Sequence, residues 1–264
     1  MKNLITILCL FSFSFGQICG EPIEIDSIEE ICNLTNLTEI NLSSNELTGE
    51  IPSCIGNLVN LTCLNLFNNQ LTGEIPLEIV NLTNLTHLIL SYNQLTGEIP
   101  SEIGNLTNLT SLNLSYNELI GEIPSELFSI SNLTYLLLYE NNLEGEIPLE
   151  VGNSFNLSEL NLSVNNFIGE IPESICQIPN LNTYNFHDNN FCPPYPECII
   201  EGWGGLGYQD TSNCEEPSLC NEETEVELWG GCYNIEETTE LLFSGEEFTG
   251  QIPPDIGNLT NLMI

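Results

Sequence analysis

Residues Leu95 to Leu109 read LTGEIPSEIGNLTNL, and close copies of this stretch recur along the chain. A fixed period of this kind is the sequence signature of a solenoid, in which each repeat forms one coil and packs only against its neighbours. We therefore expect about seven stacked 24-residue repeats over residues 34–200. Isoleucine–proline pairs mark the period at 51–52, 75–76, 99–100, 123–124, 147–148 and 171–172.

Each repeat carries leucines in the pattern L-x-x-L-x-L, as at Leu109, Leu112 and Leu114. The last two leucines alternate with polar residues as they do in a β-strand. Stacked coils therefore predict a parallel sheet whose strands lie about 4.8 Å apart. The seven strands are expected to begin near Leu37, Leu61, Leu85, Leu109, Leu133, Leu157 and Leu181.

Three further positions of the repeat have predicted mechanical roles. The asparagine after each strand, such as Asn117, can satisfy backbone groups of the turn with its amide. The glycine that follows, such as Gly121, permits a turn that a side chain would hinder. The proline, such as Pro124, has a fixed φ and no N–H donor, so we expect short returning segments of irregular or 3-10 structure.

The pattern L-x-x-L-x-L-x-x-N-x-L-x-G-x-I-P over Leu34 to Pro196 resembles the plant-type leucine-rich repeat. The resemblance implies a β-rich solenoid shaped as a horseshoe, with a parallel β-sheet on the concave face and short irregular or 3-10 segments on the convex face. It also implies that the concave sheet serves recognition, as in plant receptor ectodomains and polygalacturonase-inhibiting proteins.

The N-terminus has the features of a signal peptide over residues 1–16. Lys2 precedes an apolar stretch from Leu4 to Phe15, and Gly16 offers a small residue for cleavage. About a dozen apolar residues are fewer than the roughly 20 that span a bilayer, and we expect no membrane span elsewhere. The sequence thus predicts a protein that is secreted or held at the cell surface.

Cleavage would leave ten cysteines, and an even number in an exported chain favours disulfide bonds. We expect a two-bridge cap at the end of the solenoid, with its pairing left open, and a separate loop closed by the last two cysteines. The cap candidates are Cys176, Cys192, Cys198 and Cys214, and the loop candidates are Cys220 and Cys232.

Around the repeats we expect three further segments. Residues 17–33 form an N-terminal cap, and residues 201–232 form a linker rich in glycine, glutamate and cysteine. The repeat returns as FTGQIPPDIGNLTNL at Phe248 to Leu262. We interpret residues 233–264 as the start of a second, truncated leucine-rich repeat array.

The charge balance limits the possible partners. The chain has 38 acidic residues and one basic residue, which gives a net charge of −37. Nucleic acids and anionic membrane surfaces would be repelled, because almost no side chain can neutralise phosphate. Cationic partners and metal counterions are favoured instead.

The concave face holds the candidate ligand-binding residues. Tyrosines with apolar neighbours are typical of the positions that dominate protein interfaces, although strands also favour aromatic residues when nothing binds. We expect a protein ligand, with a polysaccharide as the alternative because tyrosines can also stack on sugars. The predicted positions are Phe67, His87, Ile89, Tyr92, Tyr116, Tyr135, Leu137 and Tyr139.

Two repeated columns suggest other binding functions. One glutamate per coil, from Glu50 to Glu170, could line up divalent cations or form a solvated face. One threonine per coil, from Thr38 to Thr134, could match an ice lattice or simply belong to the repeat. His87 and His187 are the only side chains that titrate near neutral pH without a large shift, and no nucleophile motif accompanies them. We therefore expect neither an enzyme nor a cofactor.

Overall fold

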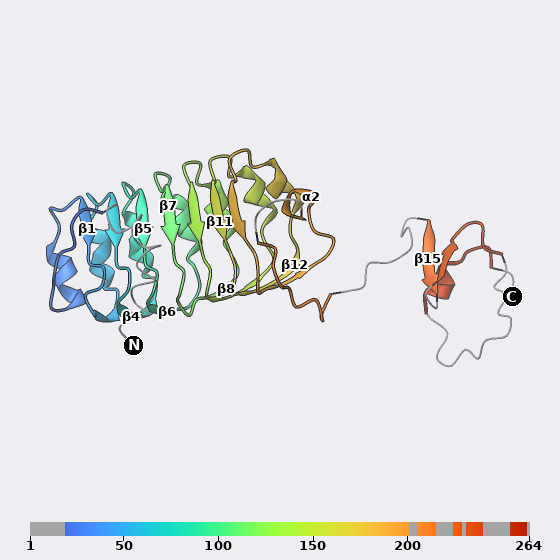
Figure 1. Ribbon diagram of the computed structural model, residues 1–264, viewed down its shortest axis with the longest axis horizontal. Helices are drawn as coiled ribbons and strands as arrows, with labels where there is room; N and C mark the ends of the chain where they lie inside the picture. Colours follow the sequence, from blue (N-terminus) through green and yellow to red (C-terminus); the bar gives the residue numbers. More distant parts are fainter. Residues whose placement is uncertain (1–18, 201–204, 215–223, 229–230, 240–253, 263–264) are drawn as a thin grey trace. The chain divides into compact units, whose positions relative to one another are not determined.

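The computed structural model describes residues 19–200, 205–214, 224–228, 231–239 and 254–262. These belong to two compact units, Met1–Cys214 and Glu215–Ile264. The first unit is a solenoid of stacked coils that follow one another in sequence order (Figure 1). Residues 205–214, which the sequence placed in a linker, belong to this first unit. The predicted signal peptide, residues 1–16, lies outside the described residues.

One face of the solenoid is a seven-stranded parallel sheet, as the sequence predicts. The strands follow in sequence order, and each residue pairs with the residue 24 positions later, as Leu64 does with Leu88. The sheet therefore aligns equivalent positions of successive repeats in columns. Its strands are β1 (Glu39–Asn41), β3 (Cys63–Asn65), β5 (His87–Ile89), β7 (Ser111–Asn113), β9 (Tyr135–Leu137), β11 (Glu159–Asn161) and β13 (Thr183–Asn185).

The strands begin two residues after the leucines that were expected to start them. The backbone N–H of Leu85 donates to the carbonyl of Leu82 at 2.9 Å, so this leucine still belongs to a turn. Bonding between coils begins with the next residue, where the N–H of Thr86 donates to Thr62 at 2.8 Å. The first leucine of each L-x-x-L-x-L pattern thus contributes to the core from the turn.

The core fills the interior of every coil with leucine and isoleucine. Leu112, Leu114 and Ile123 are at most 2% exposed. On the opposite side, a proline caps every returning 3-10 segment except the first, which Ser27 caps. Pro76, for example, has φ −65°, and its carbonyl accepts the N–H of Ile79 at 3.0 Å. The prediction of short 3-10 segments is confirmed. They are η1 (Ile28–Asn33), η2 (Ser53–Asn57), η3 (Leu77–Asn81), η4 (Ser101–Asn105), η5 (Ser125–Ser129), η6 (Leu149–Asn153) and η7 (Glu173–Gln177).

A second set of parallel strands, which the sequence did not reveal, lies between the main sheet and the 3-10 segments. The strands span the stretches around T-G-E, whose glycine indicated only a turn. Their pairing joins residues 22 apart, as Gly73 pairs with Leu95. One sheet contains β2 (Thr48–Glu50), β4 (Gln70–Glu74) and β6 (Gln94–Thr96), and the other contains β8 (Ile120–Gly121), β10 (Asn142–Gly145), β12 (Asn166–Glu170) and β14 (Asn190–Cys192).

The asparagine after each main strand has the predicted role. Asn117 is 8% exposed, and its Nδ2 donates to the carbonyls of Leu90, Leu114 and Ser115 at 3.0–3.3 Å. Its Oδ1 accepts the N–H of Leu95 at 3.0 Å. Each such asparagine therefore bonds both its own turn and the preceding coil. We call asparagines with this pattern the ladder asparagines. The others are Asn69, Asn93, Asn141, Asn165 and Asn189.

Disulfide bonds close both ends of the solenoid. Cys19–Cys63 and Cys32–Cys54 join the first coils, and Cys176–Cys198 and Cys192–Cys214 join the last. The two-bridge cap is thus confirmed, and its pairing is now assigned. Cys198 lies on the short helix α2 (Glu197–Ile200). Cys220 lies outside the described residues, as does the side chain of Cys232, so the predicted loop between them stays a prediction.

The cap includes part of an eighth coil. The backbone at Gly205 pairs with Asn185, and the backbone at Gln209 pairs with Asn189. The Nε2 of Gln209 donates to the carbonyls of Phe186 and Leu206 at 2.8 and 2.6 Å. Gln209 therefore takes the place of the ladder asparagine on a coil that ends at the Cys214 disulfide.

The second unit contains the hairpin of β15 (Glu225–Leu228) and β16 (Gly231–Asn234), followed by η8 (Pro254–Asn258). The Nδ2 of Asn261 donates to the carbonyl of Glu236, 25 residues earlier, at 2.6 Å. The same spacing joins Asn108 to Thr83 in the solenoid, at 2.9 Å. This supports the interpretation that residues 233–264 begin a second array, which remains a prediction.

Candidate ligand-binding face

Four of the predicted concave residues form a continuous row of aromatic rings. Phe67 meets Tyr92 edge to face at a centroid distance of 5.3 Å, and Tyr92 stacks on Tyr116 at 4.0 Å. Tyr116 in turn meets Tyr139 edge to face at 5.2 Å. We call Phe67, Tyr92, Tyr116 and Tyr139 the aromatic row. All four are partly exposed.

The aromatic row draws on two positions of the repeat. Phe67 and Tyr139 follow their strands on the sheet face, whereas Tyr92 and Tyr116 lie in the adjoining turn with φ of +58° and +53°. The turn position has positive φ in every coil, where asparagine, aspartate or glycine is the ordinary choice. The backbone therefore gives no reason for two successive tyrosines there. Ser44, Asn68, Glu140, Val164 and Asp188 occupy the same turn position in other coils.

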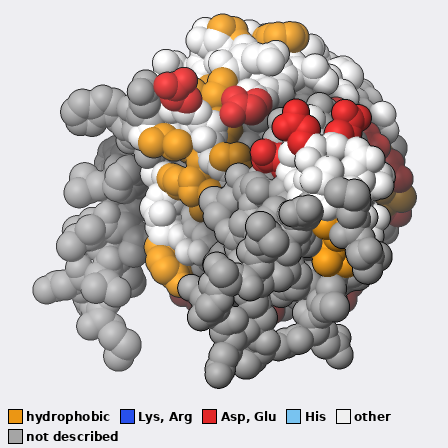
Figure 2. Space-filling model, turned by 90° about the vertical axis from the view of Figure 1, so that its right-hand side faces the viewer, with side chains coloured by type: hydrophobic (Ala, Val, Ile, Leu, Met, Phe, Trp, Pro, Cys, Tyr) orange, Lys and Arg blue, Asp and Glu red, His pale blue; other side chains and the backbone are white. Residues whose placement is uncertain are grey.

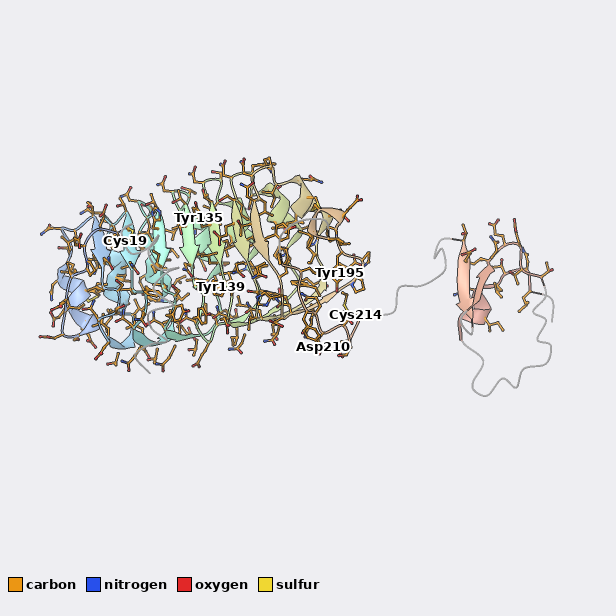
Figure 3. All side chains as sticks on the ribbon, viewed as in Figure 1. Cys19, Tyr135, Tyr139, Tyr195, Asp210 and Cys214 are labelled. Carbon is orange, nitrogen blue, oxygen red and sulfur yellow. A yellow bond between two sulfur atoms is a disulfide. The ribbon has the colours of Figure 1, made fainter. Side chains whose placement is uncertain are left out.

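The other predicted residues lie in separate columns. Tyr135 is 38% exposed and His87 is half-buried. Both lie in a column that the column of Ile89 and Leu137 separates from the aromatic row. Figure 3 shows Tyr135 and Tyr139 near the middle of the solenoid and Cys214 at its C-terminal end. Ser111 lies in register between His87 and Tyr135 on the sheet. The structure thus joins four of the eight predicted residues directly and places these two in a separate column of the same sheet.

The expectation that Ile89 and Leu137 are exposed is wrong. Ile89 is 1% exposed and Leu137 is 4% exposed. Both occupy the middle one of the three positions that face this side of the sheet, so side chains surround them on their own strand and on both neighbouring strands. Asn113 is in register with each of them and lies between them.

Two serines on this face were not singled out from the sequence. The hydroxyl groups of Ser91 and Ser111 are buried and lack a hydrogen-bond partner, and each side chain is 1% exposed. Serine is common at concave positions of this chain, so nothing in the sequence distinguishes these two. A buried hydroxyl without a partner carries an energetic cost that a ligand can relieve by hydrogen bonding.

Burial shapes the electrostatics of the face. It raises the pKa of Tyr92 far above the usual value, and a hydrogen bond with Tyr116 adds to the rise. Burial likewise raises the pKa of Tyr139 and of Glu159. For His87, burial lowers the pKa, and the charge of Glu39 opposes the shift. At neutral pH the face therefore presents neutral rings beside carboxylates.

The glutamate column has a packing role. The Cγ atom of Glu74 lies over Gly97 of the next coil, and the same contact recurs along the solenoid. No cluster of His, Cys, Asp or Glu that could hold a metal ion occurs among the described residues.

The threonine column also has a structural role. The Oγ1 of Thr86 donates to the carbonyl of Thr62 at 2.8 Å, and the Oγ1 of Thr110 donates to Thr86 at 2.9 Å. These hydroxyl donors are therefore already used between coils, which leaves fewer of them for a lattice of ice.

Each of the two histidine rings contacts the side chain of an adjacent residue. Nδ1 of His187 lies 2.6 Å from Oδ2 of Asp188, and Nδ1 of His87 lies 2.9 Å from the Thr86 hydroxyl. Both contacts join neighbours in sequence.

Comparison with known families assigns the repeat. A model of the leucine-rich repeat region matches residues 17–119, and a model of the single leucine-rich repeat matches residues 132–154 and 156–178. Together these matches span more than half of the chain. The chain belongs to the plant-type leucine-rich repeat family. No curated protein matches this leucine-rich repeat chain.

Among solved structures, this leucine-rich repeat protein is similar to two receptor ectodomains from Arabidopsis. One is the ectodomain of the membrane receptor kinase GASSHO1/SCHENGEN3 from Arabidopsis thaliana in complex with CASPARIAN STRIP INTEGRITY FACTOR 2. It is 38% identical in sequence, with a TM-score of 0.64, and the match covers 67% of this chain and 21% of that one. The other is the receptor kinase HAESA in complex with the peptide hormone IDA and the co-receptor SERK1, with 39% identity, a TM-score of 0.60, and coverage of 64% and 28%.

A plant ice-binding protein is also similar, with 36% identity, a TM-score of 0.55, and coverage of 58% of this chain and 50% of that one. The leucine-rich repeat chain thus spans half or less of the length of each of these three structures.

These neighbours include ligand-binding ectodomains of plant receptors, whose leucine-rich repeats are typically non-catalytic recognition modules. Together with the four disulfides, they indicate a leucine-rich repeat protein that works outside the cell or at its surface. No helix in the described part of the chain is long and apolar enough to cross a membrane.

Proposed function

We propose that this protein is an exported recognition module that binds a protein ligand on its concave sheet. The aromatic row is the observation that carries the proposal. Four partly exposed rings in mutual contact present a large, rigid apolar surface, and tyrosine is enriched among residues that dominate binding energy. Because each ring is already held by its neighbours, little conformational entropy is lost on binding.

The architecture supports the same role. Disulfides at both ends fix the coils that flank the face, and the ladder asparagines fix the coils between them. A rigid scaffold of this kind presents side chains with little rearrangement on binding. Several similar structures were solved with ligands, among them HAESA with a peptide hormone and a co-receptor. We assign the contact to the aromatic row together with His87 and Tyr135.

The test uses the full secreted chain as bait for extracellular proteins of its own source, with captured proteins identified by mass spectrometry. A captured protein supports the proposal when the Tyr116→Ala/Tyr135→Ala variant no longer holds it. The matched control is Phe155→Ala, which removes an aromatic ring that is 60% exposed outside the aromatic row. Retention of every captured protein by the double variant would overturn the proposal.

Ice binding is the second candidate, favoured by the similarity to the plant ice-binding protein. The bonds between threonine hydroxyls and preceding coils count against the threonine column as its ice-contacting surface. Ice-recrystallisation inhibition by the secreted chain at micromolar concentration would support this function. Its absence would leave the protein-ligand proposal alone.

A further inference from the structure

We infer that the concave face recognises a positively charged side chain of its ligand, in a site formed by the aromatic row and two carboxylates, Glu140 and Glu159. This inference rests on the proposed function and names the ligand chemistry that the face accepts.

The register places a carboxylate next to the tyrosines in two columns. Glu140 occupies the turn position that Tyr92 and Tyr116 hold in the two preceding coils, with φ of +56° against their +58° and +53°. Glu159 pairs directly with Tyr135 in the main sheet. Tyr139 precedes Glu140 in sequence, and the charges of both Glu159 and Glu140 act on its hydroxyl. Glu140 therefore adjoins one end of the aromatic row, and Glu159 lies beside Tyr135 on the strand that follows the strand of Tyr139.

The ring geometry suits a cation at the same end. Tyr116 and Tyr139 meet at an interplanar angle of 78° with their centroids 5.2 Å apart, so a ring face and a perpendicular ring form a corner. A cation within about 6 Å of a ring centroid is attracted by the electrons of its face. Carboxylates beside such a corner add direct charge attraction, which is stronger where water is excluded.

The buried serines provide an independent indication of a ligand. Ser111 lies in register with Tyr135, and Ser91 lies one coil before Ser115, which hydrogen-bonds to the Tyr139 hydroxyl. Neither serine hydroxyl has a partner, and both are buried. A guanidinium group carries five N–H donors, so it can bond hydroxyl and carboxylate oxygens at once.

The composition argues against a preference for anionic ligands. The chain has no arginine, and its single lysine, Lys2, lies in the predicted signal peptide. The part of the molecule visible in Figure 2 shows carboxylates in red and no lysine or arginine in blue among the described residues. An anionic ligand would find no compensating charge on the solenoid, whereas a cationic one gains from the whole field of the protein.

The experiment compares two small probes that differ in charge and little in shape, N-acetylarginine amide and N-acetylcitrulline amide. Each is titrated into the full secreted chain with ring-labelled tyrosines at physiological salt, and the tyrosine signals are followed by NMR. We expect the arginine probe to shift the signals of Tyr92, Tyr116 and Tyr139 and to bind roughly tenfold more tightly than the citrulline probe. The signals of Tyr195 and Tyr208, outside the row, should stay in place.

Two variants locate the site. Tyr116→Leu keeps an apolar side chain and removes the ring, and Glu140→Gln keeps the shape and removes the charge; each should weaken the arginine probe several-fold. Glu98→Gln, on the exposed glutamate column, removes the same charge elsewhere and should leave binding unchanged. Any of three results would overturn the inference. The two probes could bind equally, Tyr195 and Tyr208 could shift as much as the row, or both site variants could bind the arginine probe as the wild-type chain does.

This outcome is separable from the capture experiment. If both probes bind alike while a captured protein still requires Tyr116 and Tyr135, the cationic preference is wrong and the protein-binding function stands. If the captured proteins ignore those tyrosines, the proposed function itself fails.

Discussion

The Cγ atom of Glu74 lies 2.8 Å from the point where a Cβ atom on Gly97 would stand, and Gly97 has φ of +76°. The same relationship joins Glu50 to Gly73 and Glu122 to Gly145. The glycine of the repeat is therefore required twice, by its backbone conformation and by the glutamate stem that packs over it. The G-E pair is a contact between coils as well as a neighbouring pair in the sequence.

Replacing Gly97 by alanine should lower the free energy of unfolding by about 1–3 kcal/mol, through positive φ and the contact with Glu74. Urea denaturation followed by circular dichroism measures the change. The Glu74→Ala/Gly97→Ala variant removes the contact and keeps the backbone strain, so it should recover part of the loss. No loss in the single variant would contradict the packing role.

Replacing Asn117 by alanine should cost about 3 kcal/mol, because the side chain bonds three carbonyls and one N–H in a buried setting. Asn108 supplies the matched control, since its exposed amide makes one bond, to the carbonyl of Thr83. Asn108→Ala should cost less than about 1 kcal/mol. If the two variants shift the denaturation midpoint equally, the bonds of Asn117 to the two coils do not stabilise the solenoid as described.

Much of the solenoid could be predicted from the sequence because its rules are local. Spacing aligned the leucines in one core and the ladder asparagines such as Asn117 in one column, and both are where the pattern indicated. The second set of strands was missed because Gly73 and its equivalents indicate a turn, while their pairing depends on neighbouring coils. Gln209 was missed because it replaces the asparagine by another residue type at a shorter spacing from Asn189.

The candidate site was only partly predictable. Tyr92 and Tyr116 lie 24 residues apart, so their contact follows from the period. Phe67 and Tyr139 come from another position of the repeat, and their contact with the tyrosine pair depends on ring orientation. The burial of Ile89 depends on how closely its surroundings pack, which a pattern of residue types does not specify.

Stability should depend on the protonation of Glu159, because burial raises the pKa of this carboxyl above its usual value of 4.5. The folded state then holds this proton more tightly than the unfolded state does. The contribution of Glu159 to the free energy of unfolding is therefore largest below pH 4.5. It is lost as the pH rises through the higher pKa of the folded state.

The Glu159→Gln variant removes this loss, so its denaturation midpoint should exceed that of the wild-type chain at pH 7 and approach it near pH 3. Glu98→Gln removes the same charge from the exposed glutamate column and controls for net charge. If Glu98→Gln stabilises the chain equally at pH 7, general charge repulsion is the cause, and the burial of Glu159 is not.

Replacing Cys192 and Cys214 by serine should release the partial eighth coil that Gln209 anchors. We expect a loss of about 2–4 kcal/mol and rapid protease cleavage within residues 205–214. The Cys32→Ser/Cys54→Ser variant removes a bridge of equal sequence separation at the other end. This variant should leave cleavage within residues 205–214 slow. If it speeds cleavage there as much as the Cys192→Ser/Cys214→Ser variant does, the Cys192–Cys214 disulfide has no local role.

Hydrogen–deuterium exchange of the secreted chain with and without a captured protein locates the surface that the ligand covers. We predict slower exchange in β3, β5, β7 and β9 of the main sheet and in the turns at Tyr92 and Tyr116, where the ligand would cover the face. Slower exchange confined to the 3-10 segments η2 to η6, with the main sheet unchanged, would contradict recognition by the concave sheet.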